Sequence, residues 1–158
     1  MSGYDAEDSS ANATSCWVKV AALSAELEDY KKSIEIYERI SQKALEGSSA
    51  GKWGVKDYLF KALLCQLVLS AKKNDMDAVE KNVERYKDIY PQLDGTREVK
   101  LIEDLMAAFK EDDMDLYSDT VFRYDEIYKL DNWTAKVLLD VKNIMKNGPG
   151  GDKEDDFS

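Results

Sequence analysis

The chain has 158 residues, of which 44% are apolar and 10% aromatic, enough for one compact domain or a short array of helical repeats with a continuous core. Its formal net charge is −10 and it contains no histidine, so it lacks the commonest general base and the usual ligand of catalytic zinc sites. These features disfavour an enzyme, a metal or cofactor site and a partner that presents phosphates.

The N-terminal residues 1–10 are polar and acidic, and we expect them to be frayed. They lack the basic start and apolar core of a signal peptide, and no apolar run in the chain approaches 18 residues. We therefore expect a soluble, cytosolic protein. Ser9 or Ser10 is positioned to cap a first helix that continues to Leu27, and a second helix follows the break at 28–29 and ends before the glycine and serine run at 47–51.

The segment 53–73 is the most apolar of the chain, and its apolar residues cover nearly every face of the predicted helix. Such a helix must be buried by neighbours on both sides. Asp77 and Glu80 have the spacing of a capping box for the next helix, which Pro91 ends after Tyr90. Further helices are predicted around 99–109, up to Tyr128 and over 133–145.

One segment of the chain repeats. Residues 75–90 recur as 113–128, an offset of 38, and both copies begin with Asp-Met-Asp. A weaker third copy follows Asp29 at an offset of 46. Repeats of this length with two helices each are typical of tetratricopeptide, HEAT or armadillo arrays. We expect an all-α, tetratricopeptide-like helix-hairpin solenoid of about seven antiparallel helices over residues 11–147, with the tyrosines of the repeated stripe in its core.

Two local features are interpreted as structural. Cys16 and Cys65 lie on predicted apolar faces, so we expect buried thiols rather than a disulfide or a metal pair. The segment 113–115 resembles the start of a calcium loop, but Ser118 and Tyr124 stand where that loop needs glycine and glutamate, so no metal site is predicted.

The charge is unevenly distributed, because residues 101–158 carry 7 basic and 15 acidic side chains. The glycine and proline run at 148–151 should end the last helix, and the acidic residues after it are too charged to be buried. We expect a flexible acidic tail over 148–158 that attracts a basic partner.

Taken together, ordered segments of the chain resemble the soluble NSF attachment proteins of the alpha type. These segments are residues 9–12, 16–21, 30–38, 56–62, 90–91, 97–101, 115–117, 124–127 and 130–133. The resemblance covers nearly the whole chain, whereas family members are about twice as long. We therefore expect a fragment or a truncated isoform that corresponds to the family's C-terminal half and lacks its membrane-touching loop.

The resemblance implies an adaptor that is not an enzyme. Such a protein grips the acidic four-helix SNARE bundle with a concave face and recruits and stimulates the hexameric ATPase NSF for SNARE disassembly in vesicle fusion and membrane trafficking. It would be cytoplasmic and peripheral on membranes through SNARE complexes. We expect it to be monomeric in dilute solution, with loose self-association where Trp17 and Val20 are exposed at its N-terminal end.

The resemblance also implies the binding residues. The family's bundle-gripping basic positions match Lys19, Lys52, Lys56, Arg97 and Lys100. The positions that contact NSF match Glu111, Asp112, Asp152, Glu154, Asp155, Asp156 and Phe157. The chain departs from the family at Ser15, where lysine is common, at Ala107 and Lys110, where acidic residues are typical, and at Phe157, where leucine is typical.

The alternative is a generic tetratricopeptide-like scaffold that clamps a peptide C-terminus. Such clamps gather basic residues on successive first helices of their repeats, whereas Lys52, Lys56, Arg97 and Lys100 fall mostly at hairpin edges and turns.

Overall fold

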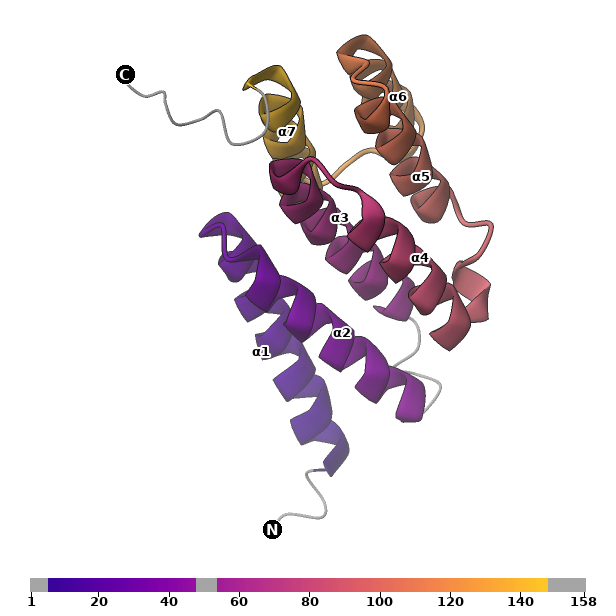
Figure 1. The fold of residues 1–158 in the computed structure, drawn as a ribbon. Coiled ribbons are helices and arrows are strands. Elements are labelled where there is room, and N and C mark those ends of the chain that lie inside the picture. The colour runs from indigo at the N-terminus through magenta and orange to yellow at the C-terminus, as the bar shows by residue number, and fades with distance from the viewer. Residues whose placement is uncertain (1–5, 48–53, 148–158) are drawn as a thin grey trace. The chain divides into compact units, whose positions relative to one another are not determined.

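The structure is a computed structural model that describes residues 6–47 and 54–147, with side chains from Thr14 onward. Seven α-helices make up the described part of the chain, with a short 3₁₀ turn between two of them (Figure 1). The elements are α1 (Ala6–Glu26), α2 (Tyr30–Glu46), α3 (Val55–Lys73), α4 (Asp77–Ile89), η3 (Pro91–Leu93), α5 (Arg97–Lys110), α6 (Met114–Tyr128) and α7 (Asn132–Asn147). The all-α prediction is confirmed.

Helix ends fall close to the predicted positions, with one exception. Helix α1 begins at Ala6, earlier than the predicted cap at Ser9 or Ser10.

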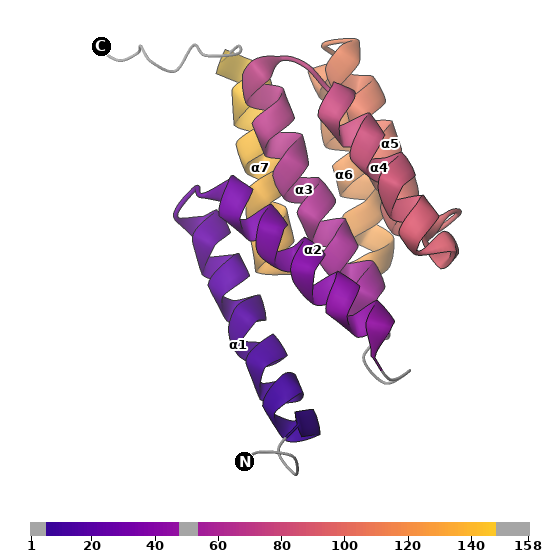
Figure 2. The same ribbon diagram turned by 60° about the horizontal axis from the view of Figure 1, so that its bottom comes forward.

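The chain divides into two compact units, Met1–Ala62 and Leu63–Ser158, and α3 spans the boundary. In the first unit, α1 and α2 form an antiparallel hairpin (Figures 1 and 2). They meet through small residues: Ala21 and Ala25 of α1 are buried, and the buried Ser33 Oγ of α2 donates to the Ala21 carbonyl at 2.8 Å. The rings of Tyr37 and Tyr58 stack with centroids 6.5 Å apart.

The second unit consists of the end of α3 and helices α4 to α7. Its core is formed by fully buried aliphatic and tyrosine side chains, among them Leu63, Leu64, Leu67, Val79, Tyr86, Leu93, Ile102, Leu105, Tyr117, Leu138 and Val141. The apolar helix predicted over 53–73 is therefore buried on most of its faces, as expected. No helix in the described ranges combines the length and apolarity needed to span a bilayer.

Three helix ends share one turn geometry. After α1, α3 and α5, a residue in the left-handed region follows: Glu28 (φ 67°), Asn74 (φ 56°) and Asp112 (φ 55°). In each turn, two successive N–H groups bond back to carbonyls of the last helical turn; after α5, Asp112 N bonds to Phe109 O at 3.0 Å and Asp113 N to Ala108 O at 2.9 Å. This is a Schellman motif, which satisfies the last carbonyls of the helix.

The residue after each left-handed residue is an aspartate that precedes the next helix, at the N-cap of α2 and α6 and one residue before the N-cap of α4. The carboxylates of Asp29, Asp75 and Asp113 accept from the backbone N–H groups of Lys32 (3.3 Å), Asp77 (3.0 Å) and Leu116 (3.0 Å) respectively. These aspartates are the ones that mark the sequence repeat, so the repeat corresponds to the turn that joins two antiparallel helices. The capping box predicted at Asp77 and Glu80 is wrong, because the residue at the N-cap is Met76, and Asp75 supplies the carboxylate.

The connection from α4 to α5 is held by charge as well as by turn chemistry. Gly95 adopts φ +82°, a conformation that glycine accepts without strain. Lys87 Nζ lies 3.7 Å from Glu84, 3.5 Å from Asp94 and 3.3 Å from Glu103. Burial alone would lower the pKa of Lys87, but its hydrogen bond to Glu103 and the three negative charges raise it.

Two expectations about burial are wrong in part. Cys65 is buried as predicted, but Cys16 is exposed, because it lies on the face of α1 opposite the small residues that meet α2. The repeated stripe is buried at Tyr86, whereas Tyr128 is 41% exposed and Ile127 71% exposed. The stripe of α6 therefore lies partly at the surface.

Candidate functional site

A basic hollow of about 200 Å³ lies between α5 and α6. Three cations line it: Arg97 and Lys100 from the first turn of α5, and Arg123 from the middle of α6. Their side chains are 50%, 76% and 75% exposed, so each can reach a partner. Leu101, Asp104, Thr120, Tyr124 and Ile127 complete the lining.

Arg97 is the most constrained of the three cations. Its guanidinium carbon lies 4.0 Å from the centroid of the Tyr128 ring, a cation–π contact. Its hydrogen bond to the Tyr124 hydroxyl raises the pKa of Arg97, and the carboxylate of Glu98, whose Oε2 lies 3.6 Å from Arg97 Nε, adds to the effect. The rings of Tyr124 and Tyr128 are 4.9 Å apart. Two tyrosines of α6 thus orient a permanently charged side chain of α5.

The other two cations are tied to carboxylates on their own helices. Lys100 Nζ lies 3.5 Å from Asp104, and an Arg123 guanidinium nitrogen lies 2.9 Å from Asp119. Both are pairs at i and i+4 on an exposed surface, which contribute little to stability. An acidic partner can therefore replace these carboxylates at small cost.

An acidic turn lies at the opposite end of α5. Glu111 caps the helix, Asp112 takes the left-handed conformation and Asp113 caps α6. All three side chains are exposed. Lys110, next to them, forms an ion pair with Glu80 of α4. The hairpin of α5 and α6 therefore presents cations at one end and carboxylates at the other.

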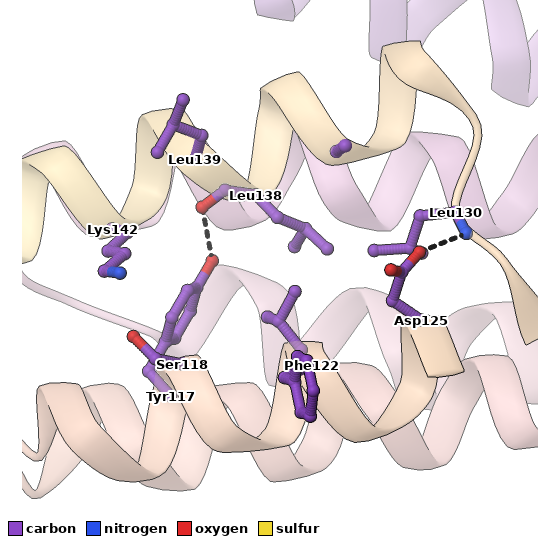
Figure 3. Close-up of a pocket in the computed structure, with 10 residues that line it drawn as sticks. Tyr117, Ser118, Phe122, Asp125, Leu130, Leu138, Leu139 and Lys142 are labelled. Carbon is purple, nitrogen blue, oxygen red and sulfur yellow. Dashed lines mark hydrogen bonds between the residues drawn. The ribbon is translucent and has the colours of Figure 1, made fainter. Parts of the chain in front are cut away.

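An apolar groove of about 400 Å³ lies between α6 and α7 (Figure 3). At one end, near Lys142, the Tyr117 hydroxyl donates to the Leu138 carbonyl at 2.7 Å, and at the other the Leu130 N–H donates to Asp125 at 2.9 Å. Desolvation raises the pKa of Tyr117 strongly, and the charge of Asp140 adds to it. Leu139 is 52% exposed at the groove.

The family model described as "Soluble NSF attachment protein, SNAP" matches residues 2–146, which is most of the chain. This chain belongs to the soluble NSF attachment protein family. The resemblance inferred from the sequence is confirmed.

Individual relatives agree with this membership. The chain is 37% identical over 152 residues to an alpha-soluble NSF attachment protein of Mus musculus, covering 96% of this chain and 48% of the relative. It is 34% identical to the alpha-soluble NSF attachment protein of Dictyostelium discoideum, and the match covers 90% of this chain and 47% of that relative. It is 36% identical to the vesicular-fusion protein SEC17 of Coprinopsis cinerea, and the match covers 93% of this chain and 49% of that relative. The chain spans about half the length of the curated relatives it matches.

The family resemblance assigned five basic residues to contacts with the SNARE bundle, and these residues do not form one site in the structure. Arg97 and Lys100 share the basic hollow. Lys19 is exposed on α1 and Lys56 half-buried in the first turn of α3, both in the first unit. Lys52 lies outside the described residues.

Of the residues assigned to NSF, Glu111 and Asp112 come together in the acidic turn. The predicted flexible tail, with Asp152, Glu154, Asp155, Asp156 and Phe157, lies outside the described residues.

Sequence reasoning missed the third cation of the hollow, Arg123, and the ring that holds Arg97, Tyr128. Tyr128 was assigned to the core because it belongs to the repeated stripe. The signal that could have found it is position, because Tyr128 is the last residue of α6. Arg123 gave no signal, since an arginine at i+4 from Asp119 is typical of any solvated helix face.

Proposed function

We propose that this protein is an adaptor, and not an enzyme, that binds SNARE complexes and recruits and stimulates an NSF-type ATPase, with no cofactor of its own. Family membership over residues 2–146 is the observation that carries the proposal. The proposed location is cytoplasmic and peripheral on membranes, through SNARE complexes. In dilute solution we expect a monomer.

The basic hollow is the proposed contact with the acidic bundle in the second unit. Its three cations are at least half exposed and come from two adjacent helices, so they form a patch rather than a single charge. Lys19, Lys52 and Lys56 are the proposed contacts from the first unit. Surface charge contacts are individually weak and screened within about 8 Å at physiological salt, so we expect the cations to act in combination.

The carboxylates of the acidic turn and the tail are the proposed contacts with the ATPase. Glu111 and Asp112 offer a fixed pair of charges next to the α5 terminus. The four acidic residues of the tail can steer association, and Phe157 supplies the apolar anchor that charge alone lacks. Removal of residues 148–158 should therefore abolish stimulation of the ATPase while leaving bundle binding intact.

The test is binding of purified ternary SNARE complex to wild type and to Arg97→Glu with Lys100→Glu. We expect the double reversal to weaken binding by roughly tenfold and wild-type affinity to fall as salt rises. The matched control is Lys81→Glu with Lys136→Glu, which changes the same charge at exposed positions of α4 and α7. Equal loss in both variants would mean that net charge, not the hollow, governs binding, and indifference to salt would contradict the proposal.

A further inference from the structure

The apolar groove between α6 and α7 takes no part in the adaptor function proposed above. Solvent reaches the side chains at its middle, since Phe122 of α6 is 59% exposed and Leu139 of α7 is 52% exposed. Covering two large apolar side chains removes their surface from water, which favours an apolar occupant. The groove of about 400 Å³ has room for an aromatic side chain.

The two ends of the groove differ in charge (Figure 3). Lys142 lies at the end toward the C-terminus of α7, and Lys146 follows it on the same face of the helix, four residues on. No carboxylate among the described residues pairs with Lys142, whereas Lys136 is paired with Asp140 at 3.3 Å. The other end of the groove holds the carboxylate of Asp125. An acidic occupant is therefore favoured at the Lys142 end.

The chain itself supplies a segment that combines these properties. Residues 152–156 carry four carboxylates and one lysine, and Phe157 comes directly after them. These residues lie outside the described part of the chain. The run of three glycines and a proline at 148–151 joins them to α7, and these residue types are typical of chain reversals. A reversal there directs the acidic stretch back along α7 toward the groove.

The length of the segment matches this path. An α-helix rises about 1.5 Å per residue, so Leu139 lies about 12 Å along the axis from Asn147, the last residue of α7. The chain from Asp152 to Phe157 spans about 16 Å in an extended conformation. After a reversal before Asp152, Phe157 therefore reaches the middle of the groove, and the carboxylates that precede it pass the two lysines.

We propose that residues 152–158 dock in the α6–α7 groove of the same chain. The ring of Phe157 lies between Phe122 and Leu139, and the carboxylates lie beside Lys142 and Lys146. The segment and the groove both belong to the second unit, so the contact needs no residue outside this chain. The acidic tail expected from the sequence thus has a site that holds its apolar end.

The basic hollow also attracts carboxylates, but it lies on the other side of α6. Phe122 and Asp125 line the groove, whereas Arg123 and Ile127 line the hollow. Successive residues of a helix are turned by about 100°, so these two pairs project from opposite sides of α6. A tail held in the groove therefore leaves the hollow open to another partner.

The aromatic ring, rather than the charges, is expected to decide how much of the tail is docked. Burial of a Phe side chain favours the docked state by about ten- to a hundredfold relative to alanine. Contacts between surface charges are individually weak and are screened by salt. A short linker gives the tail an effective concentration on the order of millimolar, so a contact of millimolar affinity is about half occupied.

Docking has a consequence for the proposed adaptor function, although the docking itself does not rest on it. The residues that enter the groove are the ones proposed above to contact the ATPase, and one tail cannot do both at once. The groove therefore restrains the tail until the ATPase competes for it.

Paramagnetic relaxation measured on the full chain locates the tail. A nitroxide is attached to Ser158→Cys in a Cys16→Ser background, which removes the exposed native thiol, while the buried Cys65 stays unlabelled. We expect selective broadening of the amide signals of Phe122 and Leu139. The broadening should be unchanged by about tenfold dilution, because the contact lies within one molecule.

Substitutions at both partners test the contact. Phe157→Ala should reduce the broadening at least about threefold, and Phe157→Leu should keep most of it. Leu139→Glu should reduce it as far as Phe157→Ala does, because it places a charge in the groove. The matched control is Leu116→Glu, since Leu116 is 43% exposed on α6 but does not line the groove.

Three results would overturn the docking. One is broadening that is absent, or that Phe157→Ala leaves unchanged. Another is broadening centred on Arg97 and Arg123, which would mean that charge draws the tail to the basic hollow instead. The third is broadening of a chain without nitroxide by a nitroxide-labelled second chain, which would mean that the groove takes the tail of another copy.

Stimulation of the ATPase tests the restraint separately. Leu139→Glu should reach half-maximal stimulation at a roughly threefold lower concentration than wild type, because its tail is already released. Equal stimulation by the two proteins would overturn the restraint. Absence of stimulation by wild type would contradict the adaptor function, whereas the docking is decided by relaxation measurements on the protein alone.

Discussion

Helices α4 and α6 carry the same sequence stripe in different surroundings. Tyr86 of α4 is fully buried, and hydrogen bonds and ion pairs join α4 to both α3 and α5. Its counterpart Tyr124 of α6 is only half-buried and faces Arg97. The repeat therefore determines how each helix begins and which residues share a face, whereas the neighbouring helix decides whether that face becomes core or binding surface.

Truncation of the two equivalent tyrosines should separate these roles most clearly. Tyr86→Ala removes a fully buried ring, so we expect it to lower the free energy of unfolding by about 3–5 kcal/mol. Tyr124→Ala should cost roughly 1–2 kcal/mol, because its ring already contacts solvent. Urea denaturation followed by circular dichroism measures both. Equal losses of unfolding free energy would mean that both tyrosines contribute equally to the core, which would contradict the proposed difference.

Tyr117 of α6 stands where α4 has Val79, and it adds a hydrogen bond that α4 lacks. Tyr117→Phe should cost about 1 kcal/mol at pH 7 through loss of the bond to Leu138. Because burial raises the pKa of Tyr117 above its ordinary value of 10.0, the unfolded chain releases this proton first. Stability should thus fall as the pH rises above about 10. Urea titrations at pH 7 to 11 should show a flatter decline for Tyr117→Phe, and identical slopes would contradict the assignment.

The capping aspartates of the two copies should differ in strength. Asp113 accepts from the N–H of Leu116, three residues on, as an N-cap does, whereas Asp75 accepts from Asp77, only two residues on. We expect Asp113→Ala to cost about 1 kcal/mol and Asp75→Ala about half as much. Thermal denaturation compares them, with the corresponding Asn variants as controls that keep an acceptor oxygen. A larger loss at Asp75 would reverse the comparison.

The smallest effect is expected in binding. Tyr128→Leu removes the ring face that holds Arg97 and should weaken SNARE-complex binding by about threefold, whereas Tyr128→Phe keeps that face and should bind as wild type. Tyr90→Leu, the counterpart at the end of α4, is the matched control and should have no effect. Loss of affinity in both Leu variants would point to a general destabilisation rather than to the orientation of Arg97.

The fold was predictable because its signals are local. The aspartates after α1, α3 and α5, the apolar stripes and the proline after Tyr90 are all short-range features of the sequence. The hollow was predictable only at Arg97 and Lys100, through the family resemblance. Its other half depends on how α6 lies beside α5, which brings Arg123 to the hollow and the Tyr128 ring to Arg97. Cys16 was misassigned for a similar reason, since an apolar face does not reveal which helix, if any, covers it.

The three carboxylates around Lys87 make this one amine the electrostatic centre of the connection between α4 and α5. Glu84, Asp94 and Glu103 come from α4, the turn and α5, and the lysine holds all three within 4 Å. Acetylation would remove the positive charge and leave three negative charges facing one another. The three carboxylates would then repel one another across the connection between α4 and α5. The first turn of α5 carries Arg97 and Lys100. Loss of this one positive charge would thus loosen the helix that carries two of the cations of the hollow.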